Sequence, residues 1–177
     1  MIERIIIAGS GGQGIMLVGR VLAEAAMREN KYVTWLPAYG AEVRGGTAHC
    51  MVIISDTDIG SPYIDKADTL IIMNNNSFHR FKNRIENNGL LIINSSLVDT
   101  GINKGKYSIR QYSFTDIAIR LGNIKVANMV ALGCFVAEKN IVEAKSISKV
   151  IETLAPPDKR GLIEINKKAL QEGMKLR

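Results

Sequence analysis

The chain has 177 residues, of which 46% are hydrophobic and 23% are charged, and its formal net charge is +6. This composition suits one globular domain spanning residues 1–177 and argues against a disordered chain. No apolar run approaches the roughly 20 residues that a membrane span needs, and Met1-Ile2-Glu3-Arg4 has no basic leader, so we expect a cytoplasmic protein.

The excess of positive charge lies in residues 120–177, which contain 11 Lys or Arg against 6 Asp or Glu. Such an excess could attract phosphate-bearing ligands or an acidic partner. It lacks the aromatic interleaving of a single-strand binder and any nucleic-acid motif, so we expect neither nucleic acid nor a membrane as partner.

Apolar periodicity divides the chain into strands followed by a helical last third. The predicted strands are 4–9, 31–36 (closed by Pro37), 47–55, 69–74, 90–96 and an edge strand at 107–114. The predicted helices are 13–29, 78–88 (stopped by Gly89), 115–121, 125–138, 143–154 and 159–175. Alternating strands and helices, with several strands apolar throughout, indicate an α/β fold: a Rossmann-like, mostly parallel sheet with helices on both faces.

The segment "AGSGGQGI" (8–15) follows the apolar run 5–7 and contains Gly9-x-Gly11-x-x-Gly14. Between a strand and a helix, such glycines permit a tight turn, a close approach of backbone to phosphate, and close packing of helix on strand. Free N–H groups at the start of the following helix then suit an anion. The turn predicts an anion site, although glycine turns also occur for packing alone.

The usual mark of a dinucleotide enzyme is an acidic residue at the end of the second strand, which binds the ribose hydroxyls. Here that position falls in "TWLPAYG" (34–40), which has no carboxylate; the first acid downstream is Glu42. A free-standing NAD dehydrogenase is therefore disfavoured. A nucleotide-binding module that works alone stays open as an alternative.

A second glycine-rich segment, "PAYGAEVRGGTAH" (37–49), follows the second strand. Tyr39, Glu42 and Arg44 could bind a ligand, and Gly45-Gly46 allow backbone to approach it. A Glu–Arg pair that merely orders a surface loop is the alternative. If both glycine-rich segments follow the carboxyl ends of parallel strands, they line one crevice.

Other reactive residues are few. Cys50 and Cys134 belong to no C-x-x-C pair, so they indicate buried reduced thiols rather than an iron–sulfur or zinc site. His49 alternates with apolar neighbours and is expected to be structural. Asn128 begins an apolar helix, where capping competes with a role in the crevice.

Five ordered segments resemble one family: "GSGGQGIMLVGRVLAEAA", "VTWLPAYGAEVRGGTAHCMVIIS", "GSPYIDKADTLIIMN", "LLIINSSLV" and "VANMVALG". The chain resembles, over essentially its whole length, the gamma subunit of the 2-oxoacid:ferredoxin oxidoreductases, the pyruvate/ketoisovalerate oxidoreductase catalytic domain family. It looks most like the 2-oxoglutarate member. The family usually has proline where this chain has Ala41. The departure puts only the rigidity expected for that loop in question.

The resemblance implies a non-autonomous subunit of an enzyme that oxidatively decarboxylates a 2-oxoacid, forms an acyl-coenzyme A and passes electrons to ferredoxin. Thiamine diphosphate, Mg and iron–sulfur clusters are expected on the alpha, beta and delta-type subunits, because this chain has no Gly-Asp dipeptide and no cysteine cluster. We expect no catalytic and no metal-binding residue on this chain alone, and a part in coenzyme A handling. The expected contacts are Gly9, Ser10, Gly11, Gly12, Gln13, Gly14, Tyr39, Glu42, Arg44, Gly45, Gly46 and Asn128. A scaffold without ligand contacts, and a homo-oligomer when the chain is isolated, stay open.

Overall fold

The computed structural model describes residues 1–39, 47–99, 101, 105–156, 158 and 160–176. The strands are β1 (Ile2–Ser10), β2 (Tyr32–Tyr39), β3 (Thr47–Ser55), β4 (Ala67–Ile72), β5 (Ile85–Asn94) and β6 (Ser108–Tyr112). The α-helices in these ranges are α1 (Ile15–Arg28), α2 (Asn75–Phe81), α3 (Phe114–Arg120), α4 (Ala127–Lys139), α5 (Ala144–Leu154) and α6 (Leu162–Met174). Two short 3₁₀ helices, η1 (Lys82–Arg84) and η2 (Ile124–Val126), precede β5 and α4. The predicted α/β fold with a helical last third is confirmed.

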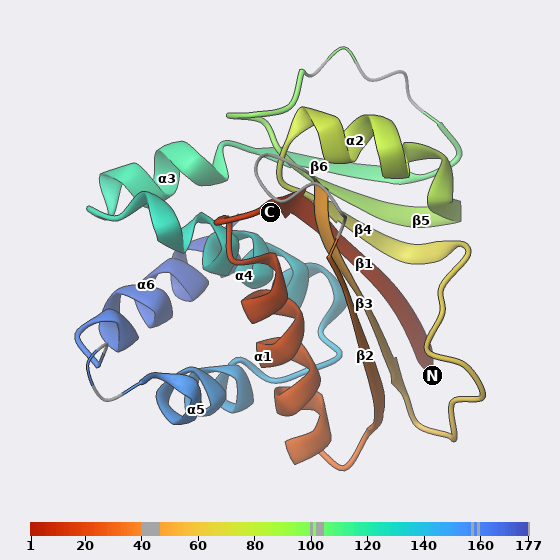
Figure 1. Ribbon diagram of the computed structural model, residues 1–177, viewed down its shortest axis with the longest axis horizontal. Helices are drawn as coiled ribbons and strands as arrows, with labels where there is room; N and C mark the ends of the chain where they lie inside the picture. The colour runs from red at the N-terminus through yellow and green to blue at the C-terminus, as the bar shows by residue number, and fades with distance from the viewer. Residues whose placement is uncertain (40–46, 100, 102–104, 157, 159, 177) are drawn as a thin grey trace.

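The six strands form one sheet in the order β2-β3-β1-β4-β5-β6 (Figure 1). The β1–β4, β4–β5 and β5–β6 ladders are parallel, whereas β3 runs antiparallel to both β1 and β2. The reversal of β3 follows from chain length, because only residues 40–46 separate it from β2, and a parallel crossover needs a dozen residues or more. Every strand except β3 therefore ends at the same side of the sheet, here called the carboxyl edge; the opposite side is the amino edge.

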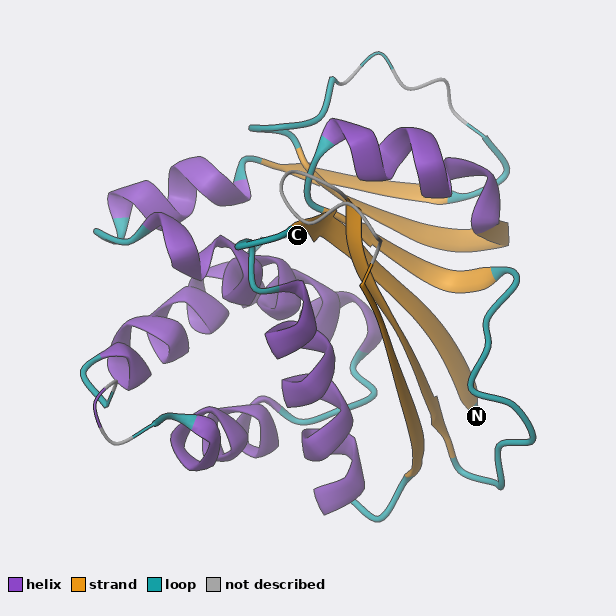
Figure 2. Cartoon of the chain, in the orientation of Figure 1, coloured by secondary structure: helices purple, strands orange, loops and turns teal. Residues whose placement is uncertain are grey.

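The two faces of the sheet are covered unequally (Figure 2). One face packs against α1, α3, α4, α5 and α6, and the fully buried residues of this larger core include Leu22, Phe114 and Phe135. The other face is covered by α2 and by the loops that carry Ile64 and Val98. Strands β1, β4 and β5 contribute to both cores, which explains the continuous apolar run in each of them.

Two glycines bring helices of the larger layer into backbone contact. A Cβ on Gly133 of α4 would overlap the Leu170 carbonyl oxygen and lie 3.0 Å from the Gly173 Cα. A Cβ on Gly173 of α6 would in turn overlap the Val130 carbonyl oxygen. Glycine at both positions therefore allows α6 to lie directly on α4, and α4 is buried on nearly all sides between α6 and the sheet.

Two predicted boundaries are wrong. The predicted helix 78–88 is helical only to Arg84, and β5 begins at Ile85, because Ile85 pairs with Ala67 and packs into the smaller core. Gly89, expected to stop that helix, lies inside β5 after a register shift in the β4–β5 ladder. The second strand does not close at Pro37 but runs to Tyr39, since an edge strand can accommodate a residue that lacks an N–H.

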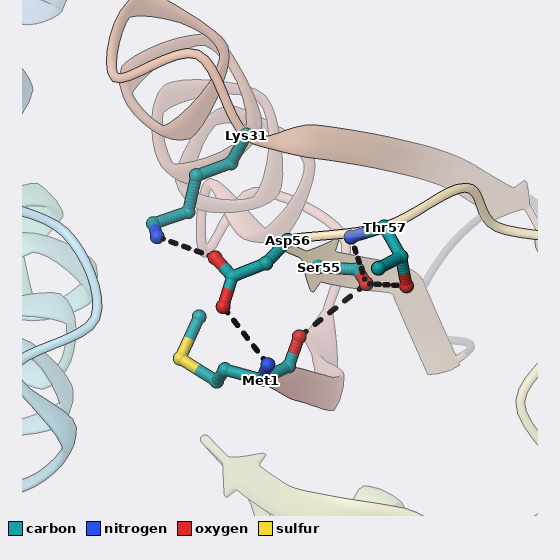
Figure 3. Close-up of polar contacts among 5 residues, drawn as sticks. All are labelled: Met1, Lys31, Ser55, Asp56 and Thr57. Carbon is teal, nitrogen blue, oxygen red and sulfur yellow. Dashed lines mark hydrogen bonds and ion pairs between the residues drawn. The ribbon is translucent and has the colours of Figure 1, made fainter.

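At the amino edge, polar groups pair with one another. The Asp56 carboxylate accepts hydrogen bonds from the Met1 ammonium at 2.8 Å and from Lys31 Nζ at 2.9 Å (Figure 3). These two bonds, the N-terminal one first, lower the pKa of Asp56. The Ser55 hydroxyl joins the Met1 carbonyl to Thr57. The group holds the starts of β1 and β2 to the end of β3.

A second pair ties the sheet to the larger helical layer. Glu3 of β1 is buried, and its carboxylate contacts Lys139 Nζ at 2.8 Å, at the end of α4. The Thr69 hydroxyl of β4 donates to the same carboxylate at 2.6 Å. Glu3 thus joins β1, β4 and α4.

Among the helices of the described ranges, none has the length and apolar character that a membrane crossing requires.

Candidate functional site

The carboxyl ends of β1 and β4 form a topological switch point. These strands are neighbours, but the chain leaves β1 for α1 on one face of the sheet and leaves β4 for α2 on the other. In open α/β sheets, ligands bind where neighbouring connections diverge in this way. The glycine turn, residues 9–14, lies at this point between β1 and α1.

The backbone of the turn explains several of its glycines. Gly12 and Gly14 have φ values of +90° and +71°, a region that side chains disfavour. A Cβ on Gly11 or on Gly12 would meet no atom of the described residues within 4 Å, so this part of the turn is open with respect to them. Gly14 directly precedes α1, whose first turn has no side-chain cap. The turn therefore presents open backbone at a helix N-terminus, the arrangement that suits an anion.

Side-chain amides from three elements hold the turn in place. Gln13 Oε1 accepts the Ser10 N–H at 2.7 Å, and Gln13 Nε2 donates to the Met73 carbonyl at 3.3 Å, just after β4. Asn74 donates to the Ser10 hydroxyl and also caps α2 by accepting the Ser77 N–H at 2.9 Å. The turn is thus joined both to itself and to the end of the neighbouring strand.

Asn128 lies against the turn from the start of α4. Its Nδ2 donates to the Gly14 carbonyl at 3.3 Å, and a Cβ on Gly14 would overlap that nitrogen. Asn128 is 4% exposed, and its Oδ1 is a buried acceptor that has no partner among the described residues. The structure therefore brings Asn128 together with the turn formed by Gly9, Ser10, Gly11, Gly12, Gln13 and Gly14, and the part of these residues in a ligand site stays a prediction.

The second glycine-rich segment joins this site through its two ends. Tyr39 is the last residue of β2 at the carboxyl edge, and Thr47 begins β3 as the register partner of Ser10. Glu42, Arg44, Gly45 and Gly46 lie outside the described residues. The ends of the two segments are brought to the same edge, and the role of the residues between them stays a prediction.

Sequence reasoning missed the amides behind the turn. Asn94 at the end of β5 is fully buried; its Nδ2 donates to Thr115 Oγ1 at 2.8 Å and approaches the Met73 carbonyl at 3.4 Å. Asn74 was missed as well. The signal was present, because "TLIIMN" and "LLIIN" each end an apolar strand with asparagine at the edge where ligands bind.

The order of the strands bears on nucleotide binding. In a dinucleotide fold, the strand beside β1 carries the ribose-binding acid at its carboxyl end. Here antiparallel β3 occupies that position, and β2 lies one strand further away, about 10 Å from β1. The neighbouring position is the start of β3, Thr47, which has no carboxylate. Among the residues that the structure describes, this arrangement does not provide the ribose contact of a dinucleotide enzyme.

The reactive side chains of the described residues do not assemble into a redox or metal centre. Burial raises the pKa of the Cys50 and Cys134 thiols to about 12, so both are protonated and poor ligands near neutral pH. In the parts of the chain that the structure describes, no three His, Cys, Asp or Glu side chains gather in a way that could bind a metal ion.

His49 is buried on the face that α2 covers. Its ring lies 4.8 Å from that of Phe81 between centroids, and its Nδ1 has no partner. Burial lowers the pKa of His49, and the charges of Arg80 and Arg84 lower it further. A neutral imidazole packed on an aromatic ring agrees with the structural role expected for it.

A separate cavity of about 130 Å³ lies between α1, α4, α5 and α6. Its lining is apolar apart from Asn166, whose Nδ2 already donates to the Leu162 carbonyl at 2.6 Å. It offers no group that could orient a polar substrate. The switch point is therefore the better candidate site.

Comparison with known proteins shows the family of the chain. The family model described as pyruvate ferredoxin/flavodoxin oxidoreductase matches residues 4–176. The 2-oxoglutarate synthase subunit KorC of Methanocaldococcus jannaschii is 33% identical over 177 residues, which cover 98% of this chain and 92% of that protein. The ketoisovalerate oxidoreductase subunit VorA of Methanothermobacter thermautotrophicus is 34% identical over 96% of this chain, which spans only about a third (35%) of VorA.

A solved structure has the same fold. The gamma subunit of a keto/oxoacid ferredoxin oxidoreductase from Geobacter sulfurreducens superposes with a TM-score of 0.84 at 30% sequence identity. The alignment covers 98% of this chain and 96% of that one. The chain therefore belongs to the pyruvate ferredoxin/flavodoxin oxidoreductase family, and its relatives include the gamma subunit of a keto/oxoacid ferredoxin oxidoreductase.

Proposed function

We propose that this chain is the gamma-type subunit of a 2-oxoacid:ferredoxin oxidoreductase that acts on 2-oxoglutarate. The observation that carries the proposal is the end-to-end correspondence with KorC, which leaves little of either protein unmatched. Relatives are also named for ketoisovalerate and pyruvate. Length disfavours VorA, because the chain corresponds to only about a third of it, and identity favours KorC at 33% over the PorC subunit of Methanothermobacter thermautotrophicus at 26%.

In this role the chain completes an active-site crevice and contributes to binding coenzyme A. Support comes from the switch point, where Gly11 and Gly12 leave backbone open at the N-terminus of α1. Coenzyme A carries phosphates, and such a turn suits a phosphate. Arg44 is proposed to add a cationic contact from the second glycine-rich segment.

The chemistry of decarboxylation and electron transfer is assigned to partner subunits. Thiamine diphosphate with Mg²⁺ needs a carboxylate and amide ligand set, and an iron–sulfur cluster needs several thiolates. The two cysteines of this chain are buried, protonated thiols. We therefore place these groups on alpha, beta and delta-type subunits, which also pass electrons to ferredoxin.

Reconstitution tests the division of labour. The chain is purified alone and in complex with its co-expressed partner subunits, and reduction of a viologen dye is followed with 2-oxoglutarate and coenzyme A. We expect turnover only in the complex. Pyruvate and 2-oxoisovalerate, assayed in parallel, test the substrate, and the highest kcat/KM is expected for 2-oxoglutarate. Dye reduction by the isolated chain would contradict the proposal.

Two alternatives remain to be separated by measurement. A nucleotide-binding module acting alone would bind NAD with micromolar Kd in a calorimetric titration of the isolated chain, whereas we expect no such binding because β3 separates β1 from β2. A scaffold without ligand contact would keep an unchanged KM for coenzyme A after Arg44→Ala in the complex. We expect that KM to rise.

A further inference from the structure

Gln13 closes the glycine turn on itself. Its backbone N–H donates to the Ser10 carbonyl at 3.2 Å, while its side-chain oxygen accepts the Ser10 N–H at 2.7 Å. Both backbone polar groups of Ser10 are thus bonded to the same residue three positions later. The Gln13 side chain therefore points back over the turn. In this position its side-chain oxygen is not available to a ligand on the outer side of the turn.

Gln13 also fixes the turn to the sheet. Its Nε2 donates to the Met73 carbonyl, which the buried Asn94 amide approaches from the β5 side. Met73 in turn donates its N–H to the Ala8 carbonyl at 2.8 Å, immediately before the turn. The end of β4 therefore forms a rigid base to which Gln13 attaches the turn.

Gly9 is explained by the same side chain. A Cβ at Gly9 would lie 2.5 Å from Gln13 Oε1 and 2.7 Å from Ile15 Cδ1, so only glycine leaves room for Gln13 to fold over. At Gly11 and Gly12, by contrast, no atom from the described part of the chain lies within 4 Å of the corresponding position. The turn thus has an inner side filled by Gln13 and an outer side that is open.

We propose that Gln13 is a positioning residue, which shapes the open Gly11–Gly12 backbone for its ligand without contacting that ligand. The inference deepens the proposed function, on which its coenzyme A readout rests. It assigns the two glutamine side-chain atoms separate tasks: Oε1 closes the turn through Ser10, and Nε2 fixes the turn's position on β4 through Met73.

Two substitutions separate these tasks. Gln13→Met keeps the length of the side chain and removes both bonds. Gln13→Glu keeps an acceptor for the Ser10 N–H but places an oxygen against the Met73 carbonyl, where two acceptors cannot bond. Gln171→Met, at an exposed position of α6, is the matched control.

Hydrogen exchange of the Ser10 amide is measured by NMR on the full chain, and KM and kcat are measured in the reconstituted complex. Gln13→Met is expected to speed Ser10 exchange roughly tenfold, because a net hydrogen bond contributes up to about that factor. In the complex it should raise KM for coenzyme A by roughly tenfold, with kcat within about twofold. Gln13→Glu should leave Ser10 exchange at or below the wild-type rate and raise KM by a smaller factor.

A direct ligand contact gives a different pattern and would overturn the proposal: both variants raise KM equally, and Ser10 exchange stays at the wild-type rate in both. Unchanged Ser10 exchange in Gln13→Met overturns it in any case. The exchange measurement needs no partner subunit. If the wild-type complex shows no coenzyme A-dependent turnover, the proposed function fails, while exchange at Ser10 still decides the role of Gln13.

Discussion

The two edges of the sheet use polar residues in opposite ways. At the amino edge, Asp56 bonds the Met1 ammonium and Lys31, and nearby Glu3 bonds Lys139 and Thr69, so charged groups there neutralise one another. At the carboxyl edge, uncharged amides hold a backbone turn whose outer side stays open, and a buried acceptor on Asn128 is left without a partner. Polar groups that pair with one another stabilise a fold. A buried polar group without a hydrogen-bond partner, by contrast, calls for an explanation, which we propose here to be a bound ligand. Changes at the amino edge should therefore affect stability alone, and changes at the carboxyl edge should affect ligand binding.

The largest effect is expected from Lys139→Met, which leaves the buried Glu3 carboxylate without its cation. Removing one partner of a fully buried pair costs about 3–5 kcal/mol, and we expect about 2–3 kcal/mol here because the Lys139 side chain is 24% exposed. Urea unfolding of the full chain measures the loss. Lys175→Met, at the exposed end of α6, is the control and should change stability by less than about 0.5 kcal/mol. Adding Glu3→Gln to Lys139→Met should restore much of the stability, and failure to do so would contradict the assignment.

Gly14→Ala should destabilise the chain by about 2 kcal/mol. About half of this comes from the positive φ, and the remainder from displacing the Asn128 amide. Gly122→Ala separates the two causes, because Gly122 has φ +92° but nothing within 4 Å of its Cβ position. The control should lose only about 1 kcal/mol in the same urea titration. Equal losses would mean that Asn128 does not constrain Gly14.

Gly11→Ala makes the sharpest contrast between the edges. A Cβ there meets no atom, so stability should change by less than about 0.5 kcal/mol. The methyl group occupies the open side of the turn, and KM for coenzyme A in the complex should rise about tenfold, equivalent to about 1.4 kcal/mol. Gly60→Ala, at an equally open position in the loop between β3 and β4, should change neither quantity. An unchanged KM in Gly11→Ala would remove the turn from the binding site.

Mild acid should lower the stability of the chain through His49, which lies near the start of β3, at the carboxyl edge of the sheet. Because its pKa in the folded chain is below the ordinary 6.5, the unfolded chain binds a proton more readily. The contribution of neutral His49 to the free energy of unfolding is therefore fully present above pH 6.5. It is lost as the pH drops below that value toward the folded-state pKa. His49→Met should flatten the Tm profile between pH 7 and 5.5, and His79→Met, at an exposed position of α2, should leave it unchanged. A profile that stays as steep in His49→Met would exclude this cause.

Stronger acid should act on the amino edge, with the smallest effect. The pKa of Asp56 is lowered below its ordinary 3.8, so its contribution is present above that value and is lost as the pH falls through the folded-state pKa. Asp56→Asn should lower Tm slightly at pH 6, and the difference from wild type should shrink as the pH falls below 3.8. Added salt should shrink it as well, since the group is exposed. A difference that does not shrink with falling pH would require another explanation.

Strands β1, β3, β4 and β5 were predictable because each contains an apolar run, and the glycine turn was predictable from its spacing. The start of β5 was not predictable, because the sequence "RIENN" is typical of a helix end. Only the pairing of Ile85 with Ala67 in the folded sheet makes it a strand. The direction of β3 was implied by the short connection but not by any residue pattern. At the site, sequence reasoning identified Gln13 and Asn128 but not their contacts, because bonds to Met73 and Gly14 join residues 60 and 114 positions apart.

The position of β1 has a consequence for how the chain folds. Its Ile5–Ile7 segment pairs on one side with β3 and on the other with β4, strands that follow some 45 and 65 residues later. During synthesis, this apolar segment therefore leaves the ribosome long before either neighbour exists. We expect β1 to stay exposed until residue 72 has emerged, and the nascent chain to depend on chaperones over that interval. Because β1 precedes both of its partner strands in the sequence, the centre of the sheet can form only late in synthesis.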